Sequence, residues 1–437
     1  MTSGRFTGLS DHFERVRRSL EEDCTACGLC LEDCPIFDTG VLAGADPTET
    51  VEGRIETASG AGFYEQAYLL ARACIRCGAC RDACPVEIDP VQANHLVRLA
   101  AAAGDGEAAA RYAADTVGLR AMLPDNPTNP FRMLQVLQMR EADVVWHTEI
   151  PRDPEQVDVL LFLSCVGMAR LDRIRTLMDL LELTGVRFAT IGGLDFCCGF
   201  LDALAGDLET GQRHFDRLAA AVDAFGAAEL VTDCPSCYGW FADLGTTQQL
   251  PFAFRHTTQL LAEHLDELPP RRALEGCVTV HDPCHFGREP AEWEPSRRLV
   301  EAVPGLRLVE MERNREHTAC CGGPATGYQP ELGRRLTEAR VREAERAGAE
   351  TILSPCSGCI SSLGPAARGA GMAAEDVVAP LARALGIEHE NRLAGILAGE
   401  TVDEILRRAA GGLWETSHDR GEIEGFVASM IARRNTF

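Results

Sequence analysis

The sequence predicts a protein of the α + α/β class, in which an α-helical N-terminal domain is followed by two copies of a βαβ-type domain. Three observations predict this arrangement. The segments around the N-terminal cysteines are rich in helix formers and lack the alternation of strands. Farther along the chain, short apolar segments typical of strands alternate with longer helical ones, as in parallel sheets. The cysteine motifs of this second part recur about 120 residues apart, which indicates a duplication.

The composition excludes several function classes. Asp and Glu number 66 against 42 basic residues, and the net charge of −24 excludes a nucleic-acid partner, which requires a basic face. Every basic residue is an arginine, so a lysine Schiff base and a phosphate-binding loop with its lysine are both excluded. Because no apolar stretch is long enough for a transmembrane segment and no signal core is visible, we expect a cytoplasmic protein. Peripheral docking at the inner face of the membrane is compatible with that location.

The N-terminal domain contains the same cysteine run twice, Cys-x-x-Cys-x-x-Cys-x-x-x-Cys-Pro. This is the run of bacterial ferredoxins, which hold [4Fe-4S] clusters through thiolates. Three cysteines of a run bind one cluster, and the fourth, set in an extended turn by its proline, reaches the other. Zinc is the alternative, but structural zinc sites take four ligands as two separated pairs. The predicted ligands are Cys24, Cys27, Cys30 and Cys84 for one cubane cluster (the first ferredoxin set) and Cys74, Cys77, Cys80 and Cys34 for the other (the second ferredoxin set).

The segments between and after these runs are predicted to be helical. Residues 63–73 (FYEQAYLLARA) and 91–103 are rich in helix formers and show no strand alternation. They favour an α-helical di-cluster ferredoxin domain over the compact β-rich kind. Two clusters close together in such a domain would conduct electrons.

Ten further cysteines form two sets of five with nearly the same spacing. Each set has a single cysteine, a Cys-Cys-Gly triplet and a Cys-x-x-Cys pair, and matching cysteines lie 119 to 123 residues apart. Each group follows a predicted strand, and parallel sheets place ligands beyond the carboxyl ends of their strands, so the thiols of a set are expected to converge. The first repeat set is Cys165, Cys197, Cys198, Cys234 and Cys237, and the second repeat set is Cys284, Cys320, Cys321, Cys356 and Cys359.

The elements of the two repeats are predicted in the same order. The strands are expected at 157–163, 186–191 and 229–233 in the first repeat and at 278–281, 306–311 and 350–354 in the second. The helices between them are expected at 173–183 and 208–224, and at 296–302 and 330–347. The predicted domains are residues 1–110 (helical ferredoxin domain), 111–156 (a linker, partly irregular because of its prolines), 157–265 (first repeat), 275–385 (second repeat) and 386–437 (C-terminal helical extension).

These motifs resemble the cysteine-rich CCG domains of heterodisulfide reductase. Two ferredoxin runs followed by two CCG domains are similar to its D-type subunit, and the same order occurs in the iron-sulfur subunits of anaerobic glycerol-3-phosphate dehydrogenase and glycolate oxidase. The resemblance covers roughly residues 20–385. It implies that each set of five cysteines holds a non-cubane [4Fe-4S] cluster and that these ten cysteines are catalytic. A small disulfide would be reduced, or formed, between the two clusters, with electrons supplied through the two cubanes.

Completeness of the sets favours this disulfide chemistry. In the glycerol-3-phosphate dehydrogenase type, by resemblance, the first domain tends to lack part of its set, whereas both sets are complete here. An electron-relay subunit of a flavin dehydrogenase (glycerol-3-phosphate, glycolate or lactate type) feeding a quinone pool is the alternative. A structural protein with zinc in its CCG sites is a third possibility, and zinc in one of the two sites stays open. We find no strand-linked G-x-G-x-x-G, so electrons must be exchanged with a redox partner subunit, a flavoprotein or a cytochrome-b-like membrane subunit.

A few residues outside the cysteine sets also draw attention. His281 and His285 bracket Cys284, and either could donate a proton or a hydrogen bond to a cluster sulfur, or simply cap a loop. Cys277 belongs to neither set and is predicted to be a small buried residue. An amphipathic helix is predicted near the C-terminus, to pack on the chain's own domains or on a partner subunit. Its apolar residues are Ile423, Phe426, Val427, Met430 and Ile431.

Overall fold

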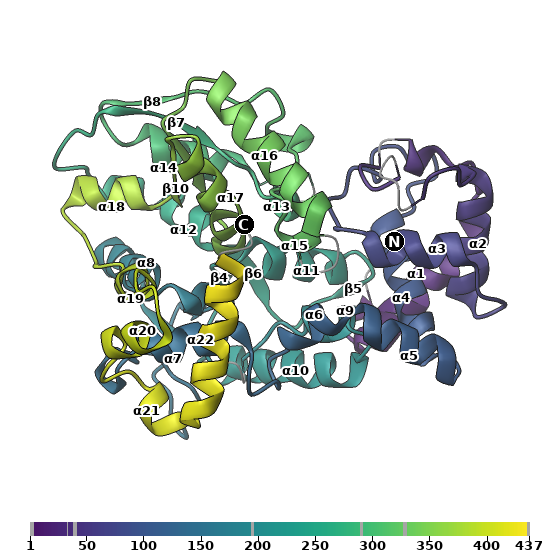
Figure 1. Cartoon of the computed structure of the whole chain (residues 1–437), viewed down its shortest axis with the longest axis horizontal. Coiled ribbons are helices and arrows are strands. Elements are labelled where there is room, and N and C mark those ends of the chain that lie inside the picture. Colours follow the sequence, from purple (N-terminus) through teal and green to yellow (C-terminus); the bar gives the residue numbers. More distant parts are fainter. Residues whose placement is uncertain are drawn as a thin grey trace.

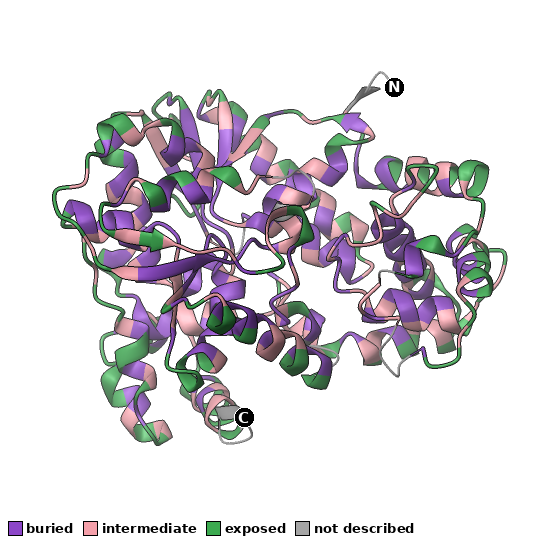
Figure 2. Ribbon diagram, turned by 90° about the horizontal axis from the view of Figure 1, so that it is seen from above, coloured by how far each residue is buried: buried purple, intermediate pink, exposed green. Residues whose placement is uncertain are grey.

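A computed structural model of the chain describes residues 4–32, 34–37, 42–193, 196–288, 292–326 and 330–434. An N-terminal helical domain, the right-hand lobe in Figure 1, adjoins two four-stranded parallel sheets and a C-terminal group of helices. This mixture of helices and parallel sheets agrees with the predicted fold class. Figure 2 shows that buried residues gather inside the sheets and helix contacts, while exposed residues lie on the outer helix faces.

Helices alternate with the cysteine runs in the N-terminal domain. Asp46 and Asp89 cap α2 and α4 by accepting hydrogen bonds from backbone N–H groups of the first turn, and a proline follows each cap. The predicted helices correspond to α3 and α4, whereas α1 and α2 were not predicted. The elements are α1 (Leu9–Asp23), η1 (Leu29–Leu31), α2 (Pro47–Ser59), α3 (Glu65–Ala73), α4 (Pro90–Ala103) and α5 (Gly106–Asp115), with strand β1 (Gly4–Arg5) paired to β5 (Gln248–Gln249) of the first repeat.

The segment before the first sheet is more helical than its prolines suggest. Pro130 occupies the first turn of α7, where its missing N–H costs nothing, and Asn129 caps that helix. Irregular backbone remains between the helices and in the stretch that leads to the first sheet. The helices are α6 (Val117–Ala121), α7 (Pro130–Gln138) and the short η2 (Glu141–Asp143).

The first repeat is built on a parallel sheet with the order β3-β2-β4-β6. The central strand β2 is buried along its whole length, as expected for a strand covered on both faces. The fourth strand, β6, was not predicted because only one of its residues is buried and it has little apolar pattern. The elements are β2 (Val159–Phe162), η3 (Gly167–Ala169), α8 (Leu171–Thr184), β3 (Phe188–Ile191), α9 (Phe200–Leu204), α10 (Leu208–Ala224), β4 (Glu229–Thr232), α11 (Pro235–Gly245), β6 (Ala253–His256), α12 (Thr257–Glu263) and η4 (Leu265–Glu267).

The second repeat has the same strand order, β8-β7-β9-β10, again with every pairing parallel. It packs on the first repeat through α12 and α14, where Leu260 and Leu261 share one buried cluster with Leu299 and Val300. The elements are β7 (Gly276–Val280), α13 (Cys284–Gly287), α14 (Glu294–Glu301), β8 (Leu306–Leu308), η5 (Arg315–His317), α15 (Gly323–Thr326), α16 (Pro330–Arg346), β9 (Thr351–Ser354), α17 (Ser357–Gly369) and β10 (Ala373–Asp376).

The glycine of each Cys-Cys-Gly triplet is required by the fold. Gly199 and Gly322 have φ values of 80° and 86°, in the left-handed region that disfavours other residues. A Cβ atom on Gly199 would lie 2.3 Å from the carbonyl oxygen of Gly211, and one on Gly322 would lie 2.3 Å from that of Gly333. The loop and the following long helix therefore touch backbone to backbone in both repeats, and this contact aligns α10 with α16.

The C-terminal helices pack on α7 of the same chain. Met133 and Leu137 of α7 lie in one buried cluster with Ile423 and Val427 of α22, both of which are completely buried. Packing on the chain's own helices thus accounts for the most buried positions of the predicted amphipathic helix. The elements of this group are α19 (Arg392–Leu397), α20 (Val402–Arg408), α21 (Trp414–Ser417) and α22 (Arg420–Arg434). The preceding helix α18 (Ala379–Leu385) packs on α8 and α14 instead. Across the described residues, we find no helix with the length and apolar character needed to span a membrane.

Candidate metal centres

The thiols of the first ferredoxin set line one small cavity in the N-terminal domain. Arg54, from α2, also lines this cavity, and its Nη2 atom donates a hydrogen bond to Cys30 Sγ at 3.3 Å. Arg54 is only 2% exposed, and its Nε and Nη1 atoms have no hydrogen-bond partner among the described residues. Burial lowers the pKa of Arg54, but the Cys30 thiol outweighs this and raises it, so a charged guanidinium sits beside the thiols. Cys27 is exposed, so one edge of this centre faces solvent.

The thiols of the second ferredoxin set are electrostatic neighbours of one another. Burial raises the pKa of Cys34 to about 11, and the nearby Cys74 thiol adds to the effect. Burial likewise raises the pKa of Cys77 to about 12, and the next contribution comes from Cys284 of the second repeat set. Cys34, Cys77 and Cys284 also contact one apolar cluster that includes Cys320. The second ferredoxin set therefore lies directly against the second repeat.

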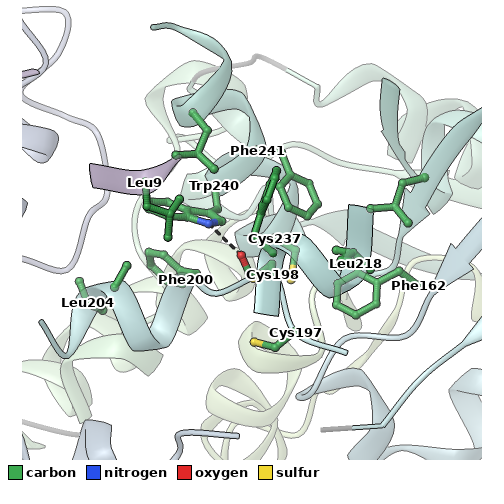
Figure 3. Packing of buried hydrophobic residues seen from close by; sticks show 14 of the residues in the cluster. Leu9, Phe162, Cys197, Cys198, Phe200, Leu204, Leu218, Cys237, Trp240 and Phe241 are labelled. Carbon is green, nitrogen blue, oxygen red and sulfur yellow. Dashed lines mark hydrogen bonds between the residues drawn. The ribbon is translucent and has the colours of Figure 1, made fainter. Parts of the chain in front are cut away.

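The five thiols of the first repeat set converge beyond the carboxyl ends of the strands. Cys165 follows β2, the Cys-Cys pair follows β3, and Cys234 and Cys237 stand at the start of α11, after β4. Burial raises the pKa of Cys165, with the Cys198 thiol as the next cause. Hydrogen bonds from the Cys197 and Cys237 thiols hold the pKa of Cys198 well below its usual range. Figure 3 shows three of these cysteines around Trp240, whose Nε1 donates to the Cys198 carbonyl oxygen at 3.0 Å.

The second repeat set is arranged in the same way. Cys284 opens α13, and its thiol raises the pKa of Cys320 through a hydrogen bond. Cys321 interacts with Cys320 and Cys359, and both thiols hold its pKa well below the usual range. The backbone N–H of Cys359 donates to Cys356 Sγ at 3.4 Å. The structure thus brings together the members of each of the four predicted sets.

These centres fit iron-sulfur clusters. All 19 cysteines are free, so the grouped thiols are not joined as disulfides. Several buried thiols whose pKa values are raised by burial and by one another cannot all ionise without a compensating cation. Metal centres supply that charge and require thiolates as ligands. Cys24, Cys27, Cys30 and Cys84 would hold one cluster, and the other sets would hold theirs in the same way.

The two histidines that bracket Cys284 have different surroundings. His285 Nδ1 lies 3.0 Å from Ser236 Oγ, and burial lowers the pKa of His285 to about 3, so the ring is neutral at pH 7. A ring nitrogen of His281 lies within 4.8 Å of both the Cys321 and Cys359 Sγ atoms. His281 thus lies beside two thiols of the second repeat set, whereas His285 contacts the first repeat. Cys277 is buried in β7, outside every set.

A polar cavity lies where the three modules meet. It is lined by Arg76 and Arg81 of the N-terminal domain, Asp243 of the first repeat, and Cys284 and His285 of the second. Asp243 accepts hydrogen bonds from both arginines at 2.7 Å. Because Arg76 and Asp243 are largely buried, this bridge fixes the second cysteine run against the first repeat.

Several charged side chains at these centres were not found from the sequence. Arg54 beside the first ferredoxin set and Arg340 behind His281 are remote in sequence from the residues they approach, whereas Asp202, which binds His214 beside Cys197, follows that cysteine by five residues. The chain has 108 charged residues, and no sequence spacing marks a single arginine or carboxylate among them as a neighbour of a metal centre. A residue-by-residue alignment of the two repeats could have identified Arg340 and Asp202 as unusual, because the matching residue of the other copy is apolar in each case.

Comparison with known families agrees with the two-part organisation. The 4Fe-4S dicluster domain family matches residues 21–88, and the cysteine-rich domain family named CCG matches residues 159–242 and 278–364. The matched ranges enclose all 18 cysteines of the four sets.

Similar proteins are oxidoreductase components. The chain is 27% identical over 417 residues to the D-type subunit of the dihydromethanophenazine:CoB–CoM heterodisulfide reductase of Methanosarcina acetivorans, covering 84% of this chain and 95% of that protein. It is 28% identical over 310 residues to the probable iron-sulfur-binding oxidoreductase FadF of Bacillus subtilis, covering 67% and 43%. It is 22% identical over 401 residues to the EtfAB:quinone oxidoreductase of Syntrophomonas wolfei, covering 78% and 54%. With one dicluster domain and two cysteine-rich domains, the chain belongs to the CCG-domain iron-sulfur protein family.

Proposed function

We propose that this chain is the iron-sulfur subunit in which a complex reduces, or in reverse forms, a disulfide between its two CCG sites. The observation that carries the proposal is the convergence of two complete five-thiol sets, of which the second adjoins the second ferredoxin set through Cys77 and Cys284. The similarity to a heterodisulfide reductase component over most of both chains supports it.

The chemistry is balanced by two electrons and two protons. A disulfide that accepts two electrons breaks its S–S bond and leaves two thiolates, which take up two protons to become thiols. Bound iron-sulfur clusters would supply the electrons one at a time, together with Lewis-acidic iron for the two sulfurs. The chain's own residues hold the thiolate ligands in place and bury them, since Cys197, Cys198 and Cys237 are all nearly inaccessible.

The exposed residues around the first ferredoxin set indicate where electrons would enter the chain. Cys27 is exposed, and its neighbours Leu29 and Val86 expose 39% and 38% of their surface, which is high for apolar residues. This edge of the first ferredoxin set suits a redox partner subunit, a flavoprotein or a cytochrome-b-like membrane subunit. The second ferredoxin set adjoins Cys284, and this packing supports entry at Cys27 and delivery at the second repeat.

A relay subunit between a flavin dehydrogenase and a quinone pool is the second candidate. The similarity to the EtfAB:quinone oxidoreductase favours it, although the chain spans only about half of that protein. A relay needs the same ferredoxin sets and the same exposed edge. It does not need a disulfide to reach the repeats, and this difference separates the two functions.

Metal analysis followed by a disulfide titration tests the proposal. Anaerobically purified protein should contain about 16 iron and 16 acid-labile sulfide per chain, with negligible zinc, if all four sets hold [4Fe-4S] clusters. Reduced protein should then be reoxidised by a small disulfide with one disulfide consumed per two electrons. Cys321→Ser should abolish this reoxidation, while Cys277→Ser, which changes a buried cysteine outside the sets, should leave it intact. About 8 iron with zinc in the remaining sites, or full iron without reoxidation by any disulfide, would contradict the proposal and leave the relay.

A further inference from the structure

Two buried side chains distinguish the second repeat from the first. His281 follows β7, and Arg340 lies on α16; both are completely buried. Arg340 Nε donates a hydrogen bond to His281 Nδ1 at 2.9 Å. Arg340 Nη1 is held in turn by the Glu343 carboxylate and the Arg313 carbonyl oxygen, both at 2.6 Å. The imidazole is therefore fixed from behind by a well-anchored guanidinium.

The equivalent positions of the first repeat are apolar. Cys165 and Cys284 occupy the same place after their strands, and three residues before them stand Phe162 and His281. The Gly211 and Gly333 contacts align α10 with α16, and in that alignment Leu218 corresponds to Arg340. Phe162 and Leu218 belong to one buried apolar cluster, as Figure 3 shows. The duplication thus carries an apolar pair in one copy and a hydrogen-bonded pair in the other.

The hydrogen bond from Arg340 determines the tautomer of His281. The Nε–H group of arginine can only donate, so Nδ1 of His281 must offer its lone pair. The neutral ring then carries its proton on Nε2. This atom is buried and has no hydrogen-bond partner among the described nitrogen and oxygen atoms. The ring adjoins the sulfur atoms of Cys321 and Cys359, all within 4.8 Å. The imidazole is hydrogen-bonded to the Cys321 side chain, and because Nδ1 faces Arg340, Nε2–H is the group left to donate to that sulfur.

The same hydrogen bond excludes His281 as a metal ligand, although His281, Cys321 and Cys359 are close enough to share an ion. A histidine that binds metal through Nε2 keeps its proton on Nδ1 and donates it to an acceptor. Arg340 offers a donor at that place, and two donors cannot face each other. The role left for the ring is that of an N–H donor to a sulfur that itself binds the metal.

We propose that His281, positioned by Arg340, donates a hydrogen bond to Cys321 and thereby gives the second CCG site a more positive reduction potential than the first. The proposal rests on the proposed function in that it requires clusters in both repeats. A hydrogen bond to a ligand sulfur stabilises the added negative charge of the reduced state, and the first repeat has only Phe162 at that place.

A second difference between the repeats lies beside the first cysteine of each Cys-Cys pair. In the first repeat, Asp202 and His214 lie within 4.8 Å of Cys197 Sγ, and His214 bonds to Asp202 at 2.9 Å. The corresponding residues of the second repeat, Ala325 and Leu336, are apolar and pack around Cys320. His214 also approaches the Asp125 carboxylate at 3.6 Å, and Asp125 lies 3.9 Å from Arg213. The polar group beside Cys197 has no counterpart beside Cys320, and it is not part of the proposal. With the more positive potential at the second site, electrons that arrive through Cys77 and Cys284 would settle there first.

A redox titration of the whole chain, followed by electron paramagnetic resonance with iron analysis, tests this proposal. His281→Phe, which installs the residue of the first repeat, should keep the full iron content and make the second-site potential more negative. The expected change is about tenfold in the ratio of reduced to oxidised second site, or about 59 mV for a one-electron couple. Arg340→Leu should have the same effect, because the ring loses its fixed tautomer. His281→Gln, which retains an N–H donor, should restore much of the potential and guards against misfolding of the phenylalanine variant.

Phe162→Leu is the matched control, since it changes the equivalent residue of the first repeat and should leave the second-site potential unchanged. Loss of about four iron from His281→Phe and from His281→Gln would overturn the proposal by making His281 a ligand. Full iron with an unchanged potential in His281→Phe would overturn it as well. The titration consumes no disulfide, so a protein that shows these shifts but reduces no disulfide contradicts only the proposed function. Wild-type protein without iron in the second repeat would contradict both.

Discussion

Arg54 is the buried charge with the largest expected effect on the first ferredoxin set. Its guanidinium donates to Cys30 Sγ at 3.3 Å and is also an electrostatic neighbour of Cys24 and of Cys80 in the second ferredoxin set. Replacing it with methionine keeps an unbranched side chain and removes the charge. Because a nearby cation stabilises the reduced, more negative cluster, Arg54→Met should lower the reduction potential of the cluster at Cys30.

The structure bounds the size of this change. Two unit charges at 3.3 Å interact by about 5 kcal/mol at an effective dielectric constant of about 20, which is an upper limit. Hydrogen bonds to charged groups contribute about 1.5 to 3 kcal/mol in proteins. For a one-electron couple, in which about 1.4 kcal/mol corresponds to about 59 mV, this is a decrease of about 65 to 130 mV. A smaller decrease is expected at the second ferredoxin set, where only Cys80 neighbours the guanidinium.

The assay is a potentiometric titration monitored by electron paramagnetic resonance, with iron analysis of each variant. Arg54→Lys keeps a charge in the pocket and should recover most of the potential. Arg111→Met removes an exposed arginine of the same domain, paired with Glu65 at 2.6 Å, and should change neither cluster. An unchanged potential in Arg54→Met at full iron content would refute the reasoning. Equal shifts in Arg54→Met and Arg54→Lys would also refute it, since side-chain shape rather than charge would then be responsible.

Three further predictions concern ligands, backbone and pH. Cys84→Ser should remove iron from the first ferredoxin set, beside Arg54. Cys34→Ser should remove iron from the second ferredoxin set instead, and the two variants should differ in their electron paramagnetic resonance spectra. Gly322→Ala should lose iron from the second repeat and cost at least about 2 kcal/mol in the free energy of unfolding, because its Cβ would meet the Gly333 carbonyl oxygen at 2.3 Å; a normal urea midpoint would contradict this. Burial lowers the pKa of His12 to about 4, below the value of 6.5 expected in the unfolded chain, so the unfolded state binds the extra proton between these values. The free energy of unfolding should therefore fall by about 1.4 kcal/mol per pH unit from this residue as pH decreases from 6.5 towards 4, and His12→Gln should reduce that slope in urea titrations.

The cysteine spacing was sufficient to group the thiols that lie together in the structure, and the reason is local. Two residues between cysteines allow one short loop to surround a metal centre, so sequence distance reports spatial distance. The repeat period grouped the remaining ten cysteines for a similar reason. Each cysteine group follows a strand, and the carboxyl ends of parallel strands lie at one edge of the sheet. The fourth strands, β6 and β10, were missed because they are short and mostly half-buried, which leaves no apolar pattern.

The tertiary structure alone decided which charges approach the thiols. Arg54 reaches Cys30 and Arg340 reaches His281 from helices distant in sequence, and for such contacts separation along the chain carries no information about distance. Likewise, Cys77 and Cys284 are electrostatic neighbours although they lie more than 200 residues apart in the sequence, and the proposed delivery of electrons to the second repeat rests on this proximity. By itself the sequence determined the kind of centre, because ligand chemistry and short loops are local properties. The difference between the His281–Arg340 pair of one repeat and the Phe162–Leu218 pair of the other depends on the packing of α16 and α10, which only the folded chain provides.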